Sequence, residues 1–204
     1  MTNFDYLKEE SQYSAFSNVA ISAERIILAD PQASIINSRR AMEFAVKWIY
    51  SVDKRLEPPY QETLVSLMGA EDFRQFVGND IYRRMDYIRR CGNDTAHTSK
   101  NLGFKEAMLC LENLSIFLDY VACCYSKPYT KHIFDKDIIL NRKEKIKKSR
   151  EENRAVKEQL EAKEIDLQAL IKENADLREQ LSARSEVQKD LYVPSPLEKT
   201  ALYR

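Results

Sequence analysis

Glycine and proline are scarce in this sequence, which has 4 glycines and 6 prolines among 204 residues. Sandwiches, propellers and other β architectures need these residues at frequent turns, so their scarcity excludes an all-β fold. The sequence also lacks an apolar run of about 18 residues, the length that a transmembrane helix requires. The first residues, MTNFDYLKEESQYS, hold no basic segment followed by an apolar one, as a secretory signal would. We therefore expect a cytoplasmic protein that does not cross a membrane.

The sequence also has no net charge, because 32 Lys and Arg residues balance 32 Asp and Glu residues. This balance argues against a protein that coats nucleic acid through bulk charge. The sequence has 2 histidines and 4 cysteines, and no cysteine stands at metal-ligand spacing from a histidine. The adjacent pair Cys123 and Cys124 does not form a CxxC motif. We expect reduced thiols and no metal site.

The first two thirds of the chain place apolar residues at helical spacing, which predicts an all-α fold. Asp30 and Pro31 are typical of a helix N-cap and first helical residue. Gly92 and Asn93 both tolerate the left-handed conformation of a helix C-terminus, so we expect a helix to end there. The expected helices cover 14–29, 31–52, 64–68, 71–77, 80–91 and 104–125. Four of these are substantial and those at 64–68 and 71–77 are short, which predicts an irregular bundle of four to five helices over residues 1–133.

The composition changes beyond this bundle, since residues 141–190 contain no aromatic residue, no glycine and no proline. Such a segment cannot build a packed core alone, and we expect a long charged helix over 134–190. With Ile146 at heptad position a, seven of twelve a and d positions are apolar, and the best stretch runs from Val156 to Leu181. This seam predicts a coiled coil.

Asn153 and Asn174 both fall at position a of this seam, which favours two strands in register. One partner for the seam is a second copy, which gives a homodimer through residues 146–184. The seam can also fold back on a later segment, or the helix can lie alone on another domain. After it, residues 191–204 contain Pro194 and Pro196, which cannot continue a helix. We expect these residues to be a linker to a missing downstream domain, and the chain to be a fragment of a larger protein.

The stretch IRRCGNDTAH at 88–97 brings together residue types that can bind phosphate or transfer protons, with two arginines, an asparagine, an aspartate and a histidine. Arginine offers a planar fork of donors suited to phosphate, and histidine exchanges a proton near neutral pH. One interpretation is a metal-free ribonuclease with His97 as acid and base and Arg90 or Arg89 on the phosphate, beside Asn93. The structural interpretation, which the spacing alone favours, is a capping turn at Asn93 and Asp94. An arginine would then pair with a carboxylate of the bundle.

Glu43 is a candidate for that carboxylate, because Arg39, Arg40 and Glu43 share one face of the helix 31–52. The arginines near Tyr82 and Tyr87, among them Arg83, form the best candidate surface for RNA. The candidate binding residues are therefore Arg39, Arg40, Glu43, Arg83, Arg89 and Asn93.

The motif SRRAME at 38–43 is followed 45 residues later by I-R-x-x-G-N-x-x-A-H at 88–97. Over about residues 12–190, this pattern resembles an all-helical bacterial domain that is grouped with the HEPN superfamily. That domain recurs at the N-terminus of R subunits of type I restriction-modification systems, which defend cells against phage. There it resembles this layout too, with a charged heptad helix between the helical domain and a nuclease and helicase motor.

The resemblance implies an accessory module on an ATP-driven, DNA-cleaving enzyme. For the parent it implies ATP and Mg²⁺ as cofactors and DNA and the methylation and specificity subunits as partners. The sequence has no GxxxxGK[ST] phosphate loop, so we expect no cofactor in this segment and place that chemistry beyond Arg204.

The resemblance to HEPN proteins also implies an alternative, a metal-free endoribonuclease that acts as a dimer. Its members carry an arginine followed, after four to six residues, by a histidine. Six residues separate Arg90 from His97, which fits this window, whereas seven separate Arg89 from His97.

Overall fold

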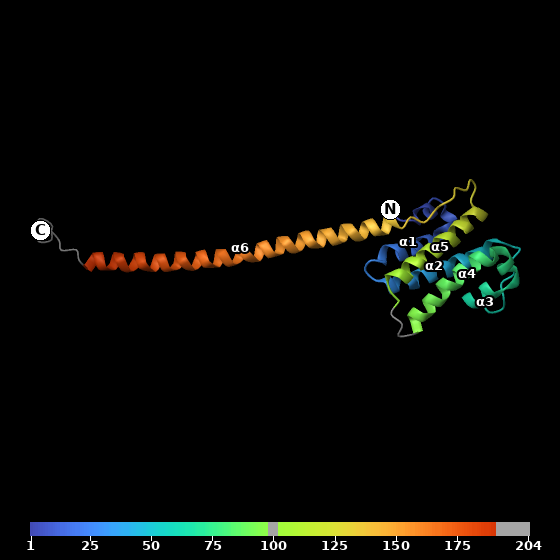
Figure 1. Cartoon of the computed structure of the whole chain (residues 1–204), viewed down its shortest axis with the longest axis horizontal. Coiled ribbons are helices and arrows are strands. Elements are labelled where there is room, and N and C mark those ends of the chain that lie inside the picture. Colours follow the sequence, from blue (N-terminus) through green and yellow to red (C-terminus); the bar gives the residue numbers. More distant parts are fainter. Residues whose placement is uncertain (98–101, 191–204) are drawn as a thin grey trace, which may run out of the picture. The chain divides into compact units, whose positions relative to one another are not determined.

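The structure, a computed structural model, describes residues 1–97 and 102–190, and side chains at 1–96 and 102–182. In these ranges every regular element is a helix, which confirms the predicted all-α fold. The helices are η1 (Asp5–Lys8), η2 (Ser11–Tyr13), α1 (Ser14–Ile26), α2 (Pro31–Val52), α3 (Leu64–Gly69), α4 (Glu71–His97), α5 (Phe104–Tyr125) and α6 (Asp137–Asp190). Figure 1 shows α1, α2, α4 and α5 as the main helices of the bundle.

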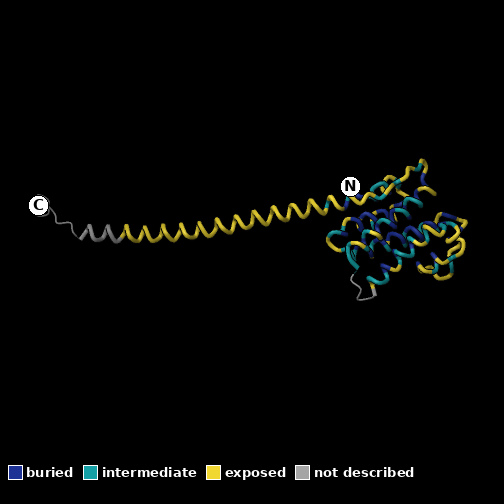
Figure 2. The backbone as a smooth tube through the Cα atoms, viewed as in Figure 1, coloured by how far each residue is buried: buried dark blue, intermediate teal, exposed yellow. Residues whose placement is uncertain are grey.

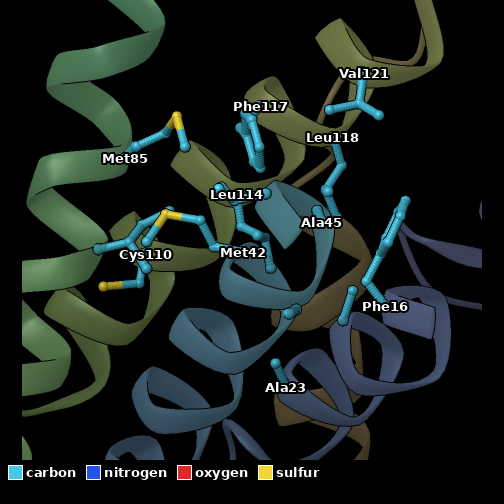
Figure 3. Close-up of a cluster of buried hydrophobic side chains, with 14 of the residues drawn as sticks. Phe16, Ala23, Met42, Ala45, Met85, Cys110, Leu114, Phe117, Leu118 and Val121 are labelled. Atoms are coloured by element: carbon cyan, nitrogen blue, oxygen red, sulfur yellow. The ribbon is translucent and has the colours of Figure 1, made fainter. Parts of the chain in front are cut away.

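Helix α2 is central, because it packs against α1, α4 and α5. In Figure 3, side chains from all four helices point toward one another, among them Phe16, Met42, Met85 and Phe117. These four residues are fully buried. Trp48 meets the rings of three neighbours edge-on or nearly so, with centroids 5.2–5.9 Å apart. It therefore belongs to the core, as its position on an apolar helix face predicts.

Local sequence signals set several helix ends. The Asp30 carboxylate accepts a 2.9 Å hydrogen bond from the backbone N–H of Ala33, and Pro31 follows as the first helical residue. The Glu106 carboxylate accepts a 2.9 Å bond from the N–H of Gly103, the residue before α5. Helices α2 and α5 have the bounds that the sequence predicts.

Helix α4 differs from its prediction at its C-terminal end. It does not end at Gly92 and Asn93 but continues to His97. The hydroxyl of Thr95 donates to the carbonyl of Cys91 at 2.8 Å, inside the turn that was expected to break. The predicted break between two helical segments lies at Gly78, whose φ of 72° and ψ of 166° suit only glycine.

Helix α5 is long and apolar enough to cross a membrane by length and composition. Ten of its residues are buried in the bundle, among them Leu111, Leu114 and Phe117. A buried, apolar helix of this kind is typical of a protein core, and we assign α5 to the core of the bundle.

The chain divides into two units, of which the first comprises Met1–Glu144 and the second begins at Lys145. The first unit extends past residue 133 because the start of α6 packs on the bundle, where Ile139 is fully buried. In the second unit, every described side chain from Lys145 to Ser182 is exposed (Figure 2). The expected linker at 191–204 lies outside the described residues.

Candidate functional site

The candidate site lies where α2 meets α4. We call it the α2–α4 corner and define it by Arg39 on α2 and by Asp86, Arg89, Arg90, Gly92 and Asn93 on α4. On α2, the hydroxyl of buried Ser38 donates to the carbonyl of Ser34 at 2.8 Å, so this side of the helix faces the core. Arg39 follows at the edge of that buried side and is half-buried, whereas Arg40 is exposed.

Gly92 lets α2 and α4 approach closely at this corner. A Cβ atom added to Gly92 would lie 2.5 Å from Cδ and 3.0 Å from Cβ of Arg39. Real Cβ atoms do not approach neighbours so closely, and so only glycine leaves room for the stem of Arg39. Gly92 therefore stays helical within α4, and its lack of a side chain lets α2 pack closely against this helix.

The Arg39 guanidinium reaches the next residue of α4. Its Nη1 donates a hydrogen bond to Oδ1 of Asn93, across 54 positions of the sequence. A charged donor on an amide oxygen makes a stronger bond than a neutral pair does. The structure therefore brings together the arginine of the first motif and the glycine and asparagine of the second as one packing unit.

Asp86 holds the other two arginines of the corner. Its Oδ1 accepts from Nε and Nη2 of Arg89 at 3.0 and 2.7 Å. Its Oδ2 lies 3.0 Å from Nη2 of Arg90. All three residues belong to α4, at i, i+3 and i+4 spacing. One carboxylate thus compensates two cations, and the Arg90 side chain stays 65% exposed.

The remaining candidate residues do not converge on this point. Glu43 pairs with Lys47 at 2.8 Å, so the expectation that it pairs with an arginine of the corner is wrong. The reason is helical geometry, since Lys47 is one turn further along the same face. The Arg40 guanidinium lies over the ring of Phe44, 5.9 Å from its centroid. Arg83 is exposed on α4.

His97 is the last residue of α4, and its side chain lies outside the described residues. The capping turn expected at Asn93 and Asp94 is wrong, because both residues are helical. Arg90 and His97 consequently belong to one uninterrupted helical segment and are seven positions, or about two turns, apart.

Two buried thiols follow this site toward the core, Cys91 on α4 and Cys110 on α5. The interaction between the two side chains lowers the pKa of Cys91, and together with burial it raises the pKa of Cys110. All four cysteines are free thiols. Cys91, directly before Gly92, therefore belongs to the buried core of the bundle.

Sequence reasoning missed several contacts in the first unit, among them these three. Nη1 of Arg84 donates to Oδ1 of Asn113 on α5 at 3.1 Å, and Arg142 pairs with Glu24 at 2.7 Å. A lone asparagine in the apolar run of α5 was the available signal for the first contact. The second joins residues 118 positions apart, and no periodicity points to it. The third is the approach of Arg39 to Gly92.

Two further features bear on ligand binding. Among the described residues, no group of three or more His, Cys, Asp or Glu side chains is placed to hold a metal ion. One open pocket lies at the junction of α3 and α4, away from the corner. It is lined by Gly69, Glu71, Arg74, Gln75, Gly78 and Asn79.

Comparison with known proteins gives one family. The model of a family described as "Domain of unknown function (DUF4145)" matches residues 22–154. This match spans both motifs of the corner and the start of α6. No curated protein and no solved structure matches the chain.

Proposed function

We propose, from the premise that the chain belongs to the DUF4145 family, that its bundle is a non-catalytic accessory module of a type I restriction R subunit. The motifs at 38–43 and 88–97 and the following heptad helix support this proposal by their resemblance to such subunits. The parent enzyme would translocate DNA with ATP and cut it with Mg²⁺, through residues beyond Arg204. Its partners would be DNA and the methylation and specificity subunits, in the cytoplasm.

The proposal that the module is non-catalytic rests on one observation, which is that the arginines of the α2–α4 corner bind acceptors of the protein itself. Arg39 donates to Asn93, and Asp86 compensates both Arg89 and Arg90. A ribonuclease needs an arginine whose charge is free for a phosphate, whereas these guanidinium groups already have acceptors on α4, Asn93 and Asp86. Such an arrangement fixes two helices against each other and suits a module that presents a stable surface.

The test extends the reading frame past codon 204. We expect it to encode a P-loop helicase and a nuclease domain, and we expect the longer polypeptide to cleave DNA with ATP and Mg²⁺. A variant of it with Arg39→Ala should lose stability in the bundle but keep ATP hydrolysis. A stop codon after Arg204, or a continuation without those motifs, would overturn the restriction assignment.

One observation favours a second candidate, the metal-free endoribonuclease. Helix α4 runs unbroken from Arg90 to His97, which places the two positions about two turns apart on one side of the helix. The Arg90 side chain is also 65% exposed, whereas the side chain of its partner Asp86 is 23% exposed. On this hypothesis, Arg90 would bind the phosphate and His97 would move the proton of the 2′-hydroxyl.

Incubation of the 204-residue chain with a structured RNA in EDTA tests this alternative. Cleavage by the wild type that disappears in both His97→Ala and Arg90→Ala would establish the ribonuclease. Equal cleavage by all three proteins indicates a contaminating nuclease and rejects it, as does an intact RNA in every sample.

A further inference from the structure

The second unit carries an apolar stripe that the described structure leaves uncovered. Along α6, the exposed fractions are 62% for Val156, 64% for Leu160, 57% for Leu167, 54% for Leu170, 49% for Leu177 and 65% for Leu181. Figure 2 shows the exposed surface continuing along the helix. Large apolar side chains at such spacing gain free energy when another helix covers them.

The stripe has the heptad period of a two-stranded coiled coil. From Val156 to Leu181, six of eight a and d positions are apolar, and the other two are Lys163 and Asn174. The ion pairs within α6 lie away from these positions. Lys147 reaches Glu151 at 3.9 Å and Arg154 reaches Glu158 at 2.9 Å, both between outward b and f positions. Lys157 at position e reaches Glu161 at position b at 3.8 Å. These pairs support the single helix and leave its seam free for a partner.

The asparagines of the seam specify its register. Asn153 and Asn174 are both at position a, three heptads apart. In a parallel, unshifted pair each asparagine faces its own copy, so both amides find a partner in the same arrangement. In an antiparallel pair a residues face d residues, so neither asparagine faces an asparagine; with Leu160 facing Leu177, Asn174 faces Lys163. A shift by one heptad would also separate them, at the cost of unsatisfied polar groups.

The flanking charges agree with the asparagines. A parallel pair brings each g residue near the e residue five positions later in the second copy. This places Glu152 beside Lys157 and Glu173 beside Arg178, which are opposite charges. The other two pairs in the seam, Gln159 with Glu164 and Asp166 with Ile171, contain no like charges.

An antiparallel pair brings g residues together and e residues together. With Leu160 facing Leu177, Asp166 would meet Glu173 and Lys157 would meet Arg178. Both contacts join like charges, which oppose association. The charge pattern therefore distinguishes the two directions and selects the parallel one.

We propose that residues 146–184 form a parallel, in-register, two-stranded coiled coil with a second copy of this chain. The second copy fits because the same sequence supplies asparagine opposite asparagine and acidic g residues opposite Lys157 and Arg178. Lys163, at position d, faces its own copy and is the one polar d residue between Val156 and Leu181. This inference goes beyond the proposed function and does not rest on it. It holds whether or not the bundle belongs to a restriction enzyme.

The test uses the whole 204-residue chain with Cys123→Ser and Cys124→Ser, because these two thiols are exposed. In this background, Leu160→Cys places one thiol in the seam at position a. Glu161→Cys is the matched control, one residue further and at the outward position b. Both proteins are oxidised at equal concentration and run on a non-reducing gel, and sedimentation equilibrium gives their mass before oxidation.

We expect a mass of twice 23.8 kDa for both variants, with a covalent dimer formed by Leu160→Cys and not by Glu161→Cys. An antiparallel dimer would have the doubled mass without this cross-link, since the two copies of position 160 would lie about 25 Å apart along the axis. That result, a monomer by sedimentation, or equal cross-linking of both variants would overturn the proposal. Far-UV circular dichroism verifies that each variant keeps its helix content.

Discussion

The guanidinium of Arg142 donates a 2.7 Å hydrogen bond to the carboxylate of Glu24, a residue with no exposed surface. The other oxygen of Glu24 accepts from the backbone N–H and the side-chain amide of Asn3, at 2.8 and 3.1 Å. Burial raises the pKa of Glu24, so its charge needs these three donors. One carboxylate thereby joins the N-terminal segment, α1 and the start of α6.

Arg142→Ala should destabilise the first unit because it leaves a buried carboxylate without its cation. We expect a loss of about 2–3 kcal/mol in the free energy of unfolding, measured by urea titration at fixed protein concentration. Arg154→Ala is the matched control, since its pair with Glu158 is exposed on both sides and lies in the same helix. That change should cost less than about 0.5 kcal/mol. Equal losses would contradict a specific role for the buried pair.

Much of the fold follows from the sequence because its signals are local. The cap at Asp30, the proline at position 31 and the apolar period fix α2, and the same period fixes α5. The end of α4 was predicted wrongly because glycine has two uses that the sequence does not distinguish. It can end a helix in the left-handed conformation, or it can stay helical and let another element approach. Gly92 does the second, and only the position of Arg39 reveals it.

The corner was predicted as a set of residues but not as a set of contacts. Arg39 and Asn93 are 54 positions apart, and their pairing depends on how α2 crosses α4. The pairing of Asp86 with Arg89 and Arg90 is local and follows from i, i+3 and i+4 spacing. Helical spacing thus limits the partners of a charged residue but does not choose among them, since Glu43 pairs with Lys47 and not with Arg39 or Arg40. A contact between helices requires the packing of the whole bundle.

Gly92→Ala should destabilise the protein, although alanine is the better helix former by about 1 kcal/mol. The new Cβ would overlap the stem of Arg39, and the guanidinium would be displaced from Asn93. We expect a net loss of about 1–3 kcal/mol, measured as a lower urea midpoint with an unchanged slope.

Gly69→Ala provides the comparison for Gly92→Ala, because a Cβ at Gly69 meets no atom within 4 Å. We expect its effect to stay within about 0.5 kcal/mol of the wild type. If Gly92→Ala proves as stable as Gly69→Ala, the close approach of Arg39 does not constrain this position.

Asp53 should contribute stability that depends on pH. The side chain of Arg55 donates to this buried carboxylate at 2.9 and 2.6 Å, and the hydroxyl of Tyr125 donates at 2.8 Å. These bonds hold the pKa of Asp53 well below its ordinary value of 3.8. A lowered pKa gives stability that is present above the ordinary value and is lost as the pH falls toward the lower one.

We therefore expect Asp53→Asn to lose about 2 kcal/mol at pH 7. The difference from the wild type should shrink as the pH falls below 3.8, because the carboxyl of the unfolded wild-type chain then takes up a proton while the folded carboxyl stays charged, and this lowers the free energy of unfolding. Urea unfolding of both proteins at pH 7, 4 and 3 measures this. A difference that stays constant with pH would show that the charge of Asp53 does not stabilise the fold.

Asp86→Asn should expose the charge of two arginines to outside ligands. The wild-type carboxylate compensates Arg89 and Arg90 together, with Arg83 exposed one turn earlier on α4. Removal of this one negative charge should strengthen binding of a short single-stranded RNA and steepen its dependence on salt. Each additional phosphate contact adds about 0.7 to the slope of log K against log salt for a single strand. Fluorescence anisotropy of a labelled oligonucleotide between 50 and 300 mM salt measures both quantities.

The control for Asp86→Asn is Glu62→Gln, which makes the same change in net charge at an exposed residue of the loop before α3. If net charge alone governs binding, the two variants should bind the RNA equally. If Asp86 screens the arginines, only Asp86→Asn should bind more tightly, and adding Arg90→Ala should reverse the gain. The result also bears on the two candidate functions, because an accessory module needs the arginines compensated. A wild type that already binds as tightly as Asp86→Asn would have a corner whose cations are free, as the ribonuclease requires.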